Sequence, residues 1–308
     1  MDSFLMVLPL ALVMGLGVLF RRIGLLDGRA VHRLNSILYW AALPALLFRS
    51  ILGVGPGILS EPNLFWAVHS TFLIVPAIAL ILARISTSDR RRLAVSVLAS
   101  IRSNNVFMGI PAVTIAMGQE GFQAVSLYLA VSLVGFNFIS ITWGQVILSG
   151  RLTLKSLHDT LLQLLKNPLI LASIMGMAGA FAGFNRLPFW LDSAVKMVGD
   201  TGSGIALIAL GASISFENLR GAMKSAWRDS LFKLFVNPAL VWCAFLAWPV
   251  DPVLRNAVVL TSAMPAAVNS FVIAHKMGMD HEYAGKIVAL STALSVFSLP
   301  IWIWLLGI

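Results

Sequence analysis

The sequence has few of the features that soluble proteins depend on. Charged residues make up only 11% of the 308 residues, whereas soluble domains average roughly 25%. Acidic residues are the scarcer kind, with 13 Asp and Glu against 22 Lys and Arg. A single cysteine, Cys243, excludes an internal disulfide and lies in an apolar stretch without metal-ligand spacing. A disulfide-stabilised secreted domain is therefore excluded, and an ordinary soluble domain does not fit this composition.

The chain also lacks the motifs that mark common enzymes. It contains no phosphate-binding loop, no His-Glu-x-x-His and no Gly-x-Ser-x-Gly, and its five histidines are scattered. An intramembrane enzyme would need a nucleophile beside its base, or metal ligands facing each other. We therefore predict that the protein is not an enzyme, is not driven by ATP bound to this chain, and needs no cofactor.

Long apolar runs dominate what is present. Hydrophobic residues make up 58% of the chain, and the runs of about 17 to 25 residues can cross a hydrocarbon core of ~30 Å. Backbone groups in a bilayer must be satisfied within each segment, which favours helices. The net charge of +9 comes from basic residues in short loops. The positive-inside rule explains this pattern, so the predicted surroundings are a lipid bilayer and no nucleic acid is implied.

Ten apolar runs are expected to be membrane spans. They cover residues 4–20, 34–52, 63–83, 93–117, 122–148, 167–184, 190–214, 229–248, 255–278 and 283–305. Asp2 precedes the first run and Arg21 follows it, so the N-terminus is predicted to lie outside. The alternating loops then place most Lys and Arg residues, Lys233 among them, on the cytoplasmic side. An even number of spans places both termini outside.

A polar linker at 151–166 divides the chain into two halves. Residues 1–150 and 167–308 would each hold five spans, so the second half enters the membrane from the opposite side, as in an inverted repeat. Met117–Gly118 and Met277–Gly278 end corresponding spans 160 residues apart. These features predict two related five-helix repeats.

The fourth and ninth spans are interrupted by polar residues, glycine and proline. The interruptions read "RSNNVFMGIP" at 102–111 and "AMPAAVNSFV" at 263–272. Pro111 and Pro265 cannot donate a helical hydrogen bond, and Gly109 adds backbone freedom. A packing kink is the alternative for either span alone. Paired breaks in corresponding spans instead indicate a transport site near the membrane midplane.

The residues around these breaks offer hydrogen-bond donors and one full positive charge. The candidate substrate-binding residues are Arg102, Ser103, Asn104, Asn105, Asn269 and Ser270. A half-helix starting near Asn105 would add the partial positive charge of its N-terminus. This combination suits a carboxylate. Arg102 could alternatively snorkel or pair with another helix.

Two further residues are candidates for ion coupling. His69 lies in the third span, where a packing role is the alternative to a proton relay. Asp200 lies in the seventh span, where the alternative is a polar outer segment before the helix proper. No sodium site or metal site can be identified from the sequence.

Four segments together resemble the auxin efflux carrier family, in its bacterial branch of malonate and organic-anion permeases. They are "LPALLF" at 43–48, "NNVFMGIP" at 104–111, "ALIALGASIS" at 206–215 and "MPAAVNSFVIAHKMG" at 264–278. The resemblance implies a substrate carboxylate bound by Asn104. Plant members have a proline at each crossover, where this chain is expected to have Ser103 and Ser270. Auxin itself is therefore not implied.

The resemblance also implies an architecture. It is an all-α membrane protein of ten helices in two inverted five-helix repeats, with helices 4 and 9 broken and crossing, as in bile-acid symporters and some sodium/proton antiporters. Helices 1, 2, 6 and 7 would form a scaffold, and helices 3–5 and 8–10 a transport domain that moves as an elevator or by rocking. The expected location is the bacterial inner membrane.

The sequence favours a secondary transporter that moves a small organic anion, a mono- or dicarboxylate, by alternating access. An anion channel or a membrane sensor on the same scaffold is the alternative. The anion, the direction of transport and the choice of sodium or a proton as coupling ion stay open. So does the oligomeric state, with a homodimer among the options.

Overall fold

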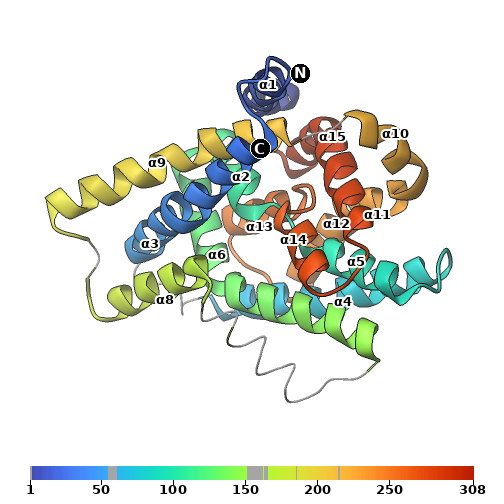
Figure 1. Ribbon diagram of the computed structural model, residues 1–308. Coiled ribbons are helices and arrows are strands. Elements are labelled where there is room, and N and C mark those ends of the chain that lie inside the picture. The colour runs from blue at the N-terminus through green and yellow to red at the C-terminus, as the bar shows by residue number, and fades with distance from the viewer. Residues whose placement is uncertain (1, 55–60, 151–161, 163–165, 185, 214–215) are drawn as a thin grey trace.

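The computed structural model describes residues 2–54, 61–150, 162, 166–184, 186–213 and 216–308 (Figure 1). Their regular structure is helical, apart from one isolated β-bridge between Ser103 and Ala266. The prediction of an all-α protein is therefore confirmed. Most of the linker expected at 151–166 lies outside the described residues.

The first half begins with three long helical runs and ends at a bent one. Its elements are α1 (Asp2–Arg22), α2 (Gly28–Ile37), the π-helix η1 (Leu38–Ala42), α3 (Leu43–Val54), α4 (Pro62–Arg84), α5 (Arg90–Ile101), the π-helix η3 (Asn105–Gly109) and α6 (Ile110–Ser149). Gly118 interrupts α6 with a φ of 64°, a left-handed conformation that glycine adopts without steric cost. This kink lies where the sequence predicts the turn between the fourth and fifth spans.

The second half is divided into more and shorter elements. They are α8 (Pro168–Phe181), α9 (Phe189–Ala212), α10 (Phe216–Ser225), α11 (Trp227–Leu231), the π-helix η4 (Phe232–Val236), α12 (Asn237–Ala247), α13 (Pro252–Ser262), α14 (Asn269–Lys276) and α15 (His281–Leu306). Gly278, after α14, has a φ of 72°. The glycines of both Met–Gly pairs thus have positive φ. Helix α10 falls between two predicted spans, where no helix was expected.

Five helical runs among the described residues are long and apolar enough to cross a membrane. They are Gly28–Gly53, Pro62–Arg84, Phe189–Ala212, Trp227–Ala247 and His281–Leu306. A sixth is the pair Asn105–Ser132 and Gly135–Ser149, bent by 48°. A multi-pass membrane protein is therefore supported, and the count of ten spans stays a prediction.

Polar side chains cap the N-termini of several of these helices. Asp89 accepts from the backbone N–H of Arg91 at 2.9 Å and so caps α5. Asn167 caps α8 and Asp251 caps α13 in the same way. Such caps satisfy N–H groups that have no partner inside the helix. They fix where the helical runs begin at the ends of the bundle.

The helices pack in two groups. In one, α1 lies against α9, and α3 packs against α8 and α9. A Cβ atom on Gly17 would overlap the carbonyl of Ile208, and one on Gly211 would overlap the carbonyl of Met14, so α1 and α9 touch backbone to backbone. In the other group, α4, α5, α6, α12 and α15 surround α13 and α14, which lie near the centre of Figure 1.

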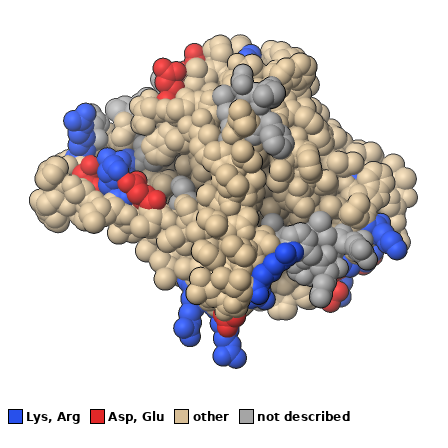
Figure 2. All heavy atoms as spheres, turned by 90° about the horizontal axis from the view of Figure 1, so that it is seen from above, with Lys and Arg blue, Asp and Glu red and all other residues tan. Residues whose placement is uncertain are grey.

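The outer surface carries many large apolar side chains. Phe189 is 88% exposed and Trp304 73% exposed, and other large hydrophobic residues are similarly placed. Figure 2 shows a broad area of uncharged residues, with Lys and Arg gathered near its margins. Hydrocarbon tails would solvate such a surface, as expected of helices in a bilayer.

Candidate functional site

The helical path stops twice, and the two non-helical segments meet. Helix α5 ends at Ile101 and η3 begins at Asn105, whereas α13 ends at Ser262 and α14 begins at Asn269. The Asn104 N–H donates to the Pro265 carbonyl at 2.8 Å, and the Ala267 N–H donates to the Arg102 carbonyl at 2.8 Å. Each segment therefore satisfies backbone groups of the other. Non-helical backbone at membrane depth survives only when it is covered in this way or lines a cavity.

The first interruption lies earlier in the chain than Gly109 and Pro111. Gly109 closes η3, where its N–H donates to the carbonyl of Asn104 at 2.9 Å, five residues back. Pro111 lies in the first turn of α6, where a missing N–H does little harm. A Cβ atom on Gly109 would come within 3.1 Å of the Thr261 side chain. Gly109 therefore permits close packing of η3 on α13, and neither residue breaks the helix.

In the second interruption, the residue opposite Ser103 is Ala266, not Ser270. Pro265 lies in this non-helical segment, as predicted, and its carbonyl accepts from the first break. Ser270 comes later, in the first turn of α14. The match between Ser270 and a crossover proline rests on the resemblance alone and stays a prediction. Ser270 is nevertheless buried beside the break.

Arg102 is fully buried and points into the group of helices around the breaks. Its guanidinium donates to Oδ1 of Asn137 at 3.2 and 3.3 Å, to Oγ of Ser140 at 2.8 Å and to Oδ1 of Asn269 at 3.3 Å. It also lies 4.7 Å from the ring centroid of Phe136. Among the described residues no carboxylate contacts it. These contacts fit the alternative in which Arg102 pairs with other helices, and the partners are neutral.

Several buried polar atoms at the two breaks have no hydrogen-bond partner in the described structure. They are Nε of Arg102, Nδ2 of Asn104, Oδ1 of Asn105 and Oγ of Ser270. Buried polar atoms are nearly always paired, so such a group indicates a place for water or a ligand. Three of the four atoms can donate. Arg102 adds a buried positive charge without a carboxylate partner among the described residues.

A small recess lies beside this segment. Its lining includes Ser103, Thr71 of α4, Tyr128 of α6, Asn237 of α12 and Ser262 of α13. This polar recess has room for about one water molecule.

The two residues considered for ion coupling have contacts of their own. The His69 ring stacks on Phe65 at 4.0 Å, and its Nδ1 lies 2.9 Å from the Phe65 carbonyl. A Cβ atom on Gly135 would overlap the ring, so His69 fills a gap between α4 and α6. Asp200 is exposed and pairs with Lys196 at 2.5 Å, one turn earlier in α9. These contacts favour the structural interpretation of both residues.

One residue near the breaks, Lys233, was counted in the sequence analysis only among the basic residues of the cytoplasmic side. Lys233 is fully buried, in η4, and its Nζ donates to the Ser262 carbonyl at 2.6 Å. It therefore lies at the end of α13, beside the second break. Its position inside the run 229–248 was the available signal, because an ionisable residue within a span marks a functional site by default.

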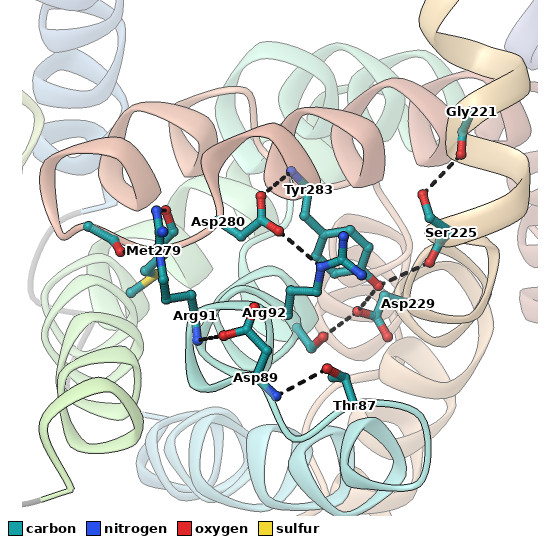
Figure 3. A network of polar contacts seen from close by, with 12 residues as sticks. Thr87, Asp89, Arg91, Arg92, Gly221, Ser225, Asp229, Met279, Asp280 and Tyr283 are labelled. Atoms are coloured by element: carbon teal, nitrogen blue, oxygen red, sulfur yellow. Dashed lines mark hydrogen bonds and ion pairs between the residues drawn. The ribbon is translucent and has the colours of Figure 1, made fainter.

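A second polar cluster joins α5, α11 and α15 (Figure 3). The buried carboxylate of Asp229 accepts from the hydroxyl of Ser96 and from that of Tyr283, the latter at 2.9 Å. Nearby, Arg92 pairs with Asp280 at 3.0 Å. Partial burial acts to raise the pKa of Asp280, but hydrogen bonds from the Tyr283 N–H and from Arg92 outweigh it and lower that pKa.

Comparison with known proteins gives matches along the whole chain. A family model described as "Membrane transport protein" matches residues 2–303. A Rhizobium meliloti protein named "Putative malonate transporter" is 25% identical, over 94% of this chain and 92% of the relative. A Methanocaldococcus jannaschii protein named "Uncharacterized transporter" is 24% identical, over 99% and 98%. "Auxin efflux carrier component 8" of Arabidopsis thaliana is 26% identical over 48% of this chain and 43% of its own length.

The matched region contains both breaks and the polar side chains that converge on them. The names of these relatives indicate transport and not enzymatic catalysis. They also agree with the resemblance found in the sequence. The chain therefore belongs to the membrane transport protein family, the family of the auxin efflux carriers.

Proposed function

We propose that the protein is a secondary transporter that moves a small organic anion across the membrane by alternating access. The observation that carries the proposal is the fully buried Arg102, whose contacts in the described structure are all neutral. A buried charge without a counter-ion is costly, and a bound anion would remove that cost. The proposed site is the place where the two breaks meet.

The proposed architecture is ten membrane helices in two inverted repeats, residues 1–150 and 167–308, joined by the linker 151–166. Helix 4 would be α5, η3 and the start of α6, and helix 9 would be α13 and α14. Two observations support this proposal. The breaks pair with each other through Ser103 and Ala266, and Gly118 and Gly278 both have positive φ, at corresponding places.

The proposed movement requires two bodies. A scaffold of helices 1, 2, 6 and 7 would correspond to α1, α2–α3, α8 and α9, and a transport domain to α4–α6 and α10–α15. The packing of α1 and α3 against α8 and α9 supports this division. Both breaks fall within the second body, so an elevator-like movement would carry the bound anion with it.

Each proposed binding residue has a distinct part. The planar fork of Arg102 suits a carboxylate, since it can donate two parallel hydrogen bonds. The free Nδ2 of Asn104 and the free hydroxyl of Ser270 would donate to the same anion. Asn269 would hold Arg102 in place. Asn105 and Ser103 would line the site from the first break, and their backbone at the start of η3 adds partial positive charge.

A small carboxylate is the proposed substrate class, with malonate as the first candidate. This choice is supported by the name of the R. meliloti relative, "Putative malonate transporter", which is 25% identical to this chain. An anion channel or a membrane sensor on the same scaffold is the competing function. A channel would bind the anion weakly and pass it without saturation, and a sensor would bind it without passing it.

The test is a ligand screen by thermal unfolding of the full chain in detergent. The panel holds malonate, malate, succinate, oxalate, 2-oxo acids and indole-3-acetate, each with and without sodium and at several pH values. A ligand at 100 times its dissociation constant stabilises the native state by about 2.7 kcal/mol. We expect a rise in Tm with one class of carboxylate, absent in Arg102→Gln. A rise with cations or neutral solutes but with no carboxylate would contradict the proposal.

A further inference from the structure

The second fully buried cation, Lys233, has a different setting from Arg102. It lies in the π-helix η4, and its Nζ donates to the carbonyl oxygen of Ser262 at 2.6 Å. Asp229, one turn earlier, would be the usual helical partner for a lysine. The Asp229 carboxylate instead accepts from Ser96, Tyr283 and Arg228. The charge of Lys233 is thus directed at a backbone carbonyl and not at an acid.

That carbonyl is the negative end of a broken helix. Ser262 is the last residue of α13, and the chain after it is non-helical as far as Asn269. The hydrogen bonds that its oxygen accepts in the described structure all come from side chains. These donors are Nζ of Lys233, Nδ2 of Asn237 at 3.1 Å and Oγ of Ser103 at 3.2 Å. The C-terminus of a helix carries a partial negative charge, which a cation stabilises.

The surroundings resemble the coordination shell of a small metal cation. Carbonyl, hydroxyl and amide oxygens are the ligands that hard cations prefer, and the C-terminal ends of broken helices coordinate cations in membrane transporters. Here the Ser262 carbonyl and the Ser103 hydroxyl supply such oxygens beside a polar recess, whereas Asn237 presents its Nδ2 donor to the Ser262 carbonyl. Lys233 brings its own single positive charge to the same place.

We propose that the Lys233 ammonium is a built-in cation that occupies, at the end of α13, the place that a bound monovalent metal cation such as Na⁺ would take. Removing the side chain would leave a water-sized space beside oxygen ligands and an unneutralised helix end. A small monovalent ion would then bind there. If Lys233 fills this place in the transporter proposed above, sodium cannot bind here as the coupling ion. This last point rests on the proposed function.

The test measures how cations affect unfolding of the full-length protein in detergent, without any anionic substrate. Tm is recorded in NaCl, KCl and choline chloride at constant ionic strength. The wild type, in which Lys233 fills this place, gives the reference response of Tm to the three salts. Lys233→Ala should have a lower Tm in choline chloride, and Na⁺ or K⁺ should restore it in a saturable manner. Lys233→Arg keeps a cation and should not respond.

Lys196→Ala is the matched control, because this exposed lysine pairs with Asp200 on its own helix; it should behave as the wild type. A response of Lys233→Ala to Na⁺ and K⁺ no larger than that of the wild type would overturn the proposal. So would a Lys233→Ala protein as stable as the wild type in choline chloride, or one that no cation restores. If Lys233→Ala does not fold in any salt, Lys233→Arg decides, since a Na⁺ response in that variant would overturn the proposal. Because no anion is present, failure of this test is distinct from failure of the transport proposal.

Discussion

Replacement of Arg102 by glutamine should remove substrate binding while the protein still folds. The side chain makes four charge-assisted hydrogen bonds to three neutral groups and lies over Phe136. Loss of one partner of a buried charged pair costs about 2 to 5 kcal/mol of binding. At 1.4 kcal/mol for each tenfold change, this weakens the dissociation constant on the order of 30- to 4,000-fold.

Stability should fall much less than binding does. Glutamine keeps one amide donor for Asn137 or Ser140, and it removes a charge whose burial is itself costly. Arg102→Lys should be intermediate in binding, because it keeps the charge but loses the planar fork and the stacking on Phe136. Isothermal titration calorimetry and thermal unfolding of the same preparations separate the two effects.

Arg49→Gln is the matched control. Arg49 lies on α3 and pairs with Asp192 of α9 at 2.7 Å, where both side chains are partly exposed. Its loss should cost at most about 1 kcal/mol of stability and leave the dissociation constant unchanged. Wild-type affinity in Arg102→Gln, or equal loss of affinity in Arg49→Gln, would refute the assignment of Arg102 to the site.

Three further predictions concern other contacts. Asn104→Ala removes the free buried amide beside the break and should abolish or strongly weaken binding in a folded protein; wild-type affinity by calorimetry would count against the site. Tyr283→Phe removes the 2.9 Å hydrogen bond to the buried Asp229 carboxylate and should lower the free energy of unfolding by about 1 to 3 kcal/mol; unchanged stability in denaturant would show that the cluster does not hold α11 to α15. The lowered pKa of Asp280 means that its stabilising effect is complete above the unfolded carboxyl pKa of about 3.9 and is lost as pH falls through the folded value. The difference in Tm between wild type and Asp280→Asn should therefore shrink as the solution is acidified below about pH 4, and a constant difference would contradict this sign.

The helices were the part of the fold most open to prediction. Apolar runs of membrane length are a strong signal, and helical elements occupy each of the ten predicted runs. The Met117–Gly118 and Met277–Gly278 pairs predicted a turn in each half, and both glycines adopt positive φ. Glycine is a dependable signal here because few other residues tolerate that conformation.

The exact place of the first break was harder to predict. Pro111 suggested a break near its own position, yet a proline in the first turn of a helix is compatible with helical structure. The π-turn at Asn105–Gly109 closes on the Asn104 carbonyl and moves the break to residues 102–104. A π-turn has no simple sequence signature, so the shift could not be foreseen.

The partners of buried charges depend on which helices meet, and no local pattern contains that information. Arg102 was identified as a candidate because it lies in an apolar run, but its contacts with Asn137 and Asn269 come from α6 and α14. Lys233 could have been found by the same rule. Its place near the predicted cytoplasmic end hid it among basic residues that the positive-inside rule already explained.

The most direct test of the central claim is exchange of radiolabelled malonate by the purified protein in lipid vesicles. If malonate fails to bind in the screen, the carboxylate that does bind takes its place. The account predicts uptake that saturates with external substrate, accelerates when unlabelled substrate is inside, and disappears in Arg102→Gln but not in Arg49→Gln. Flux that rises linearly with concentration and ignores the internal substrate would instead indicate a channel. Vesicles that pass none of the carboxylates would contradict transport of a small organic anion.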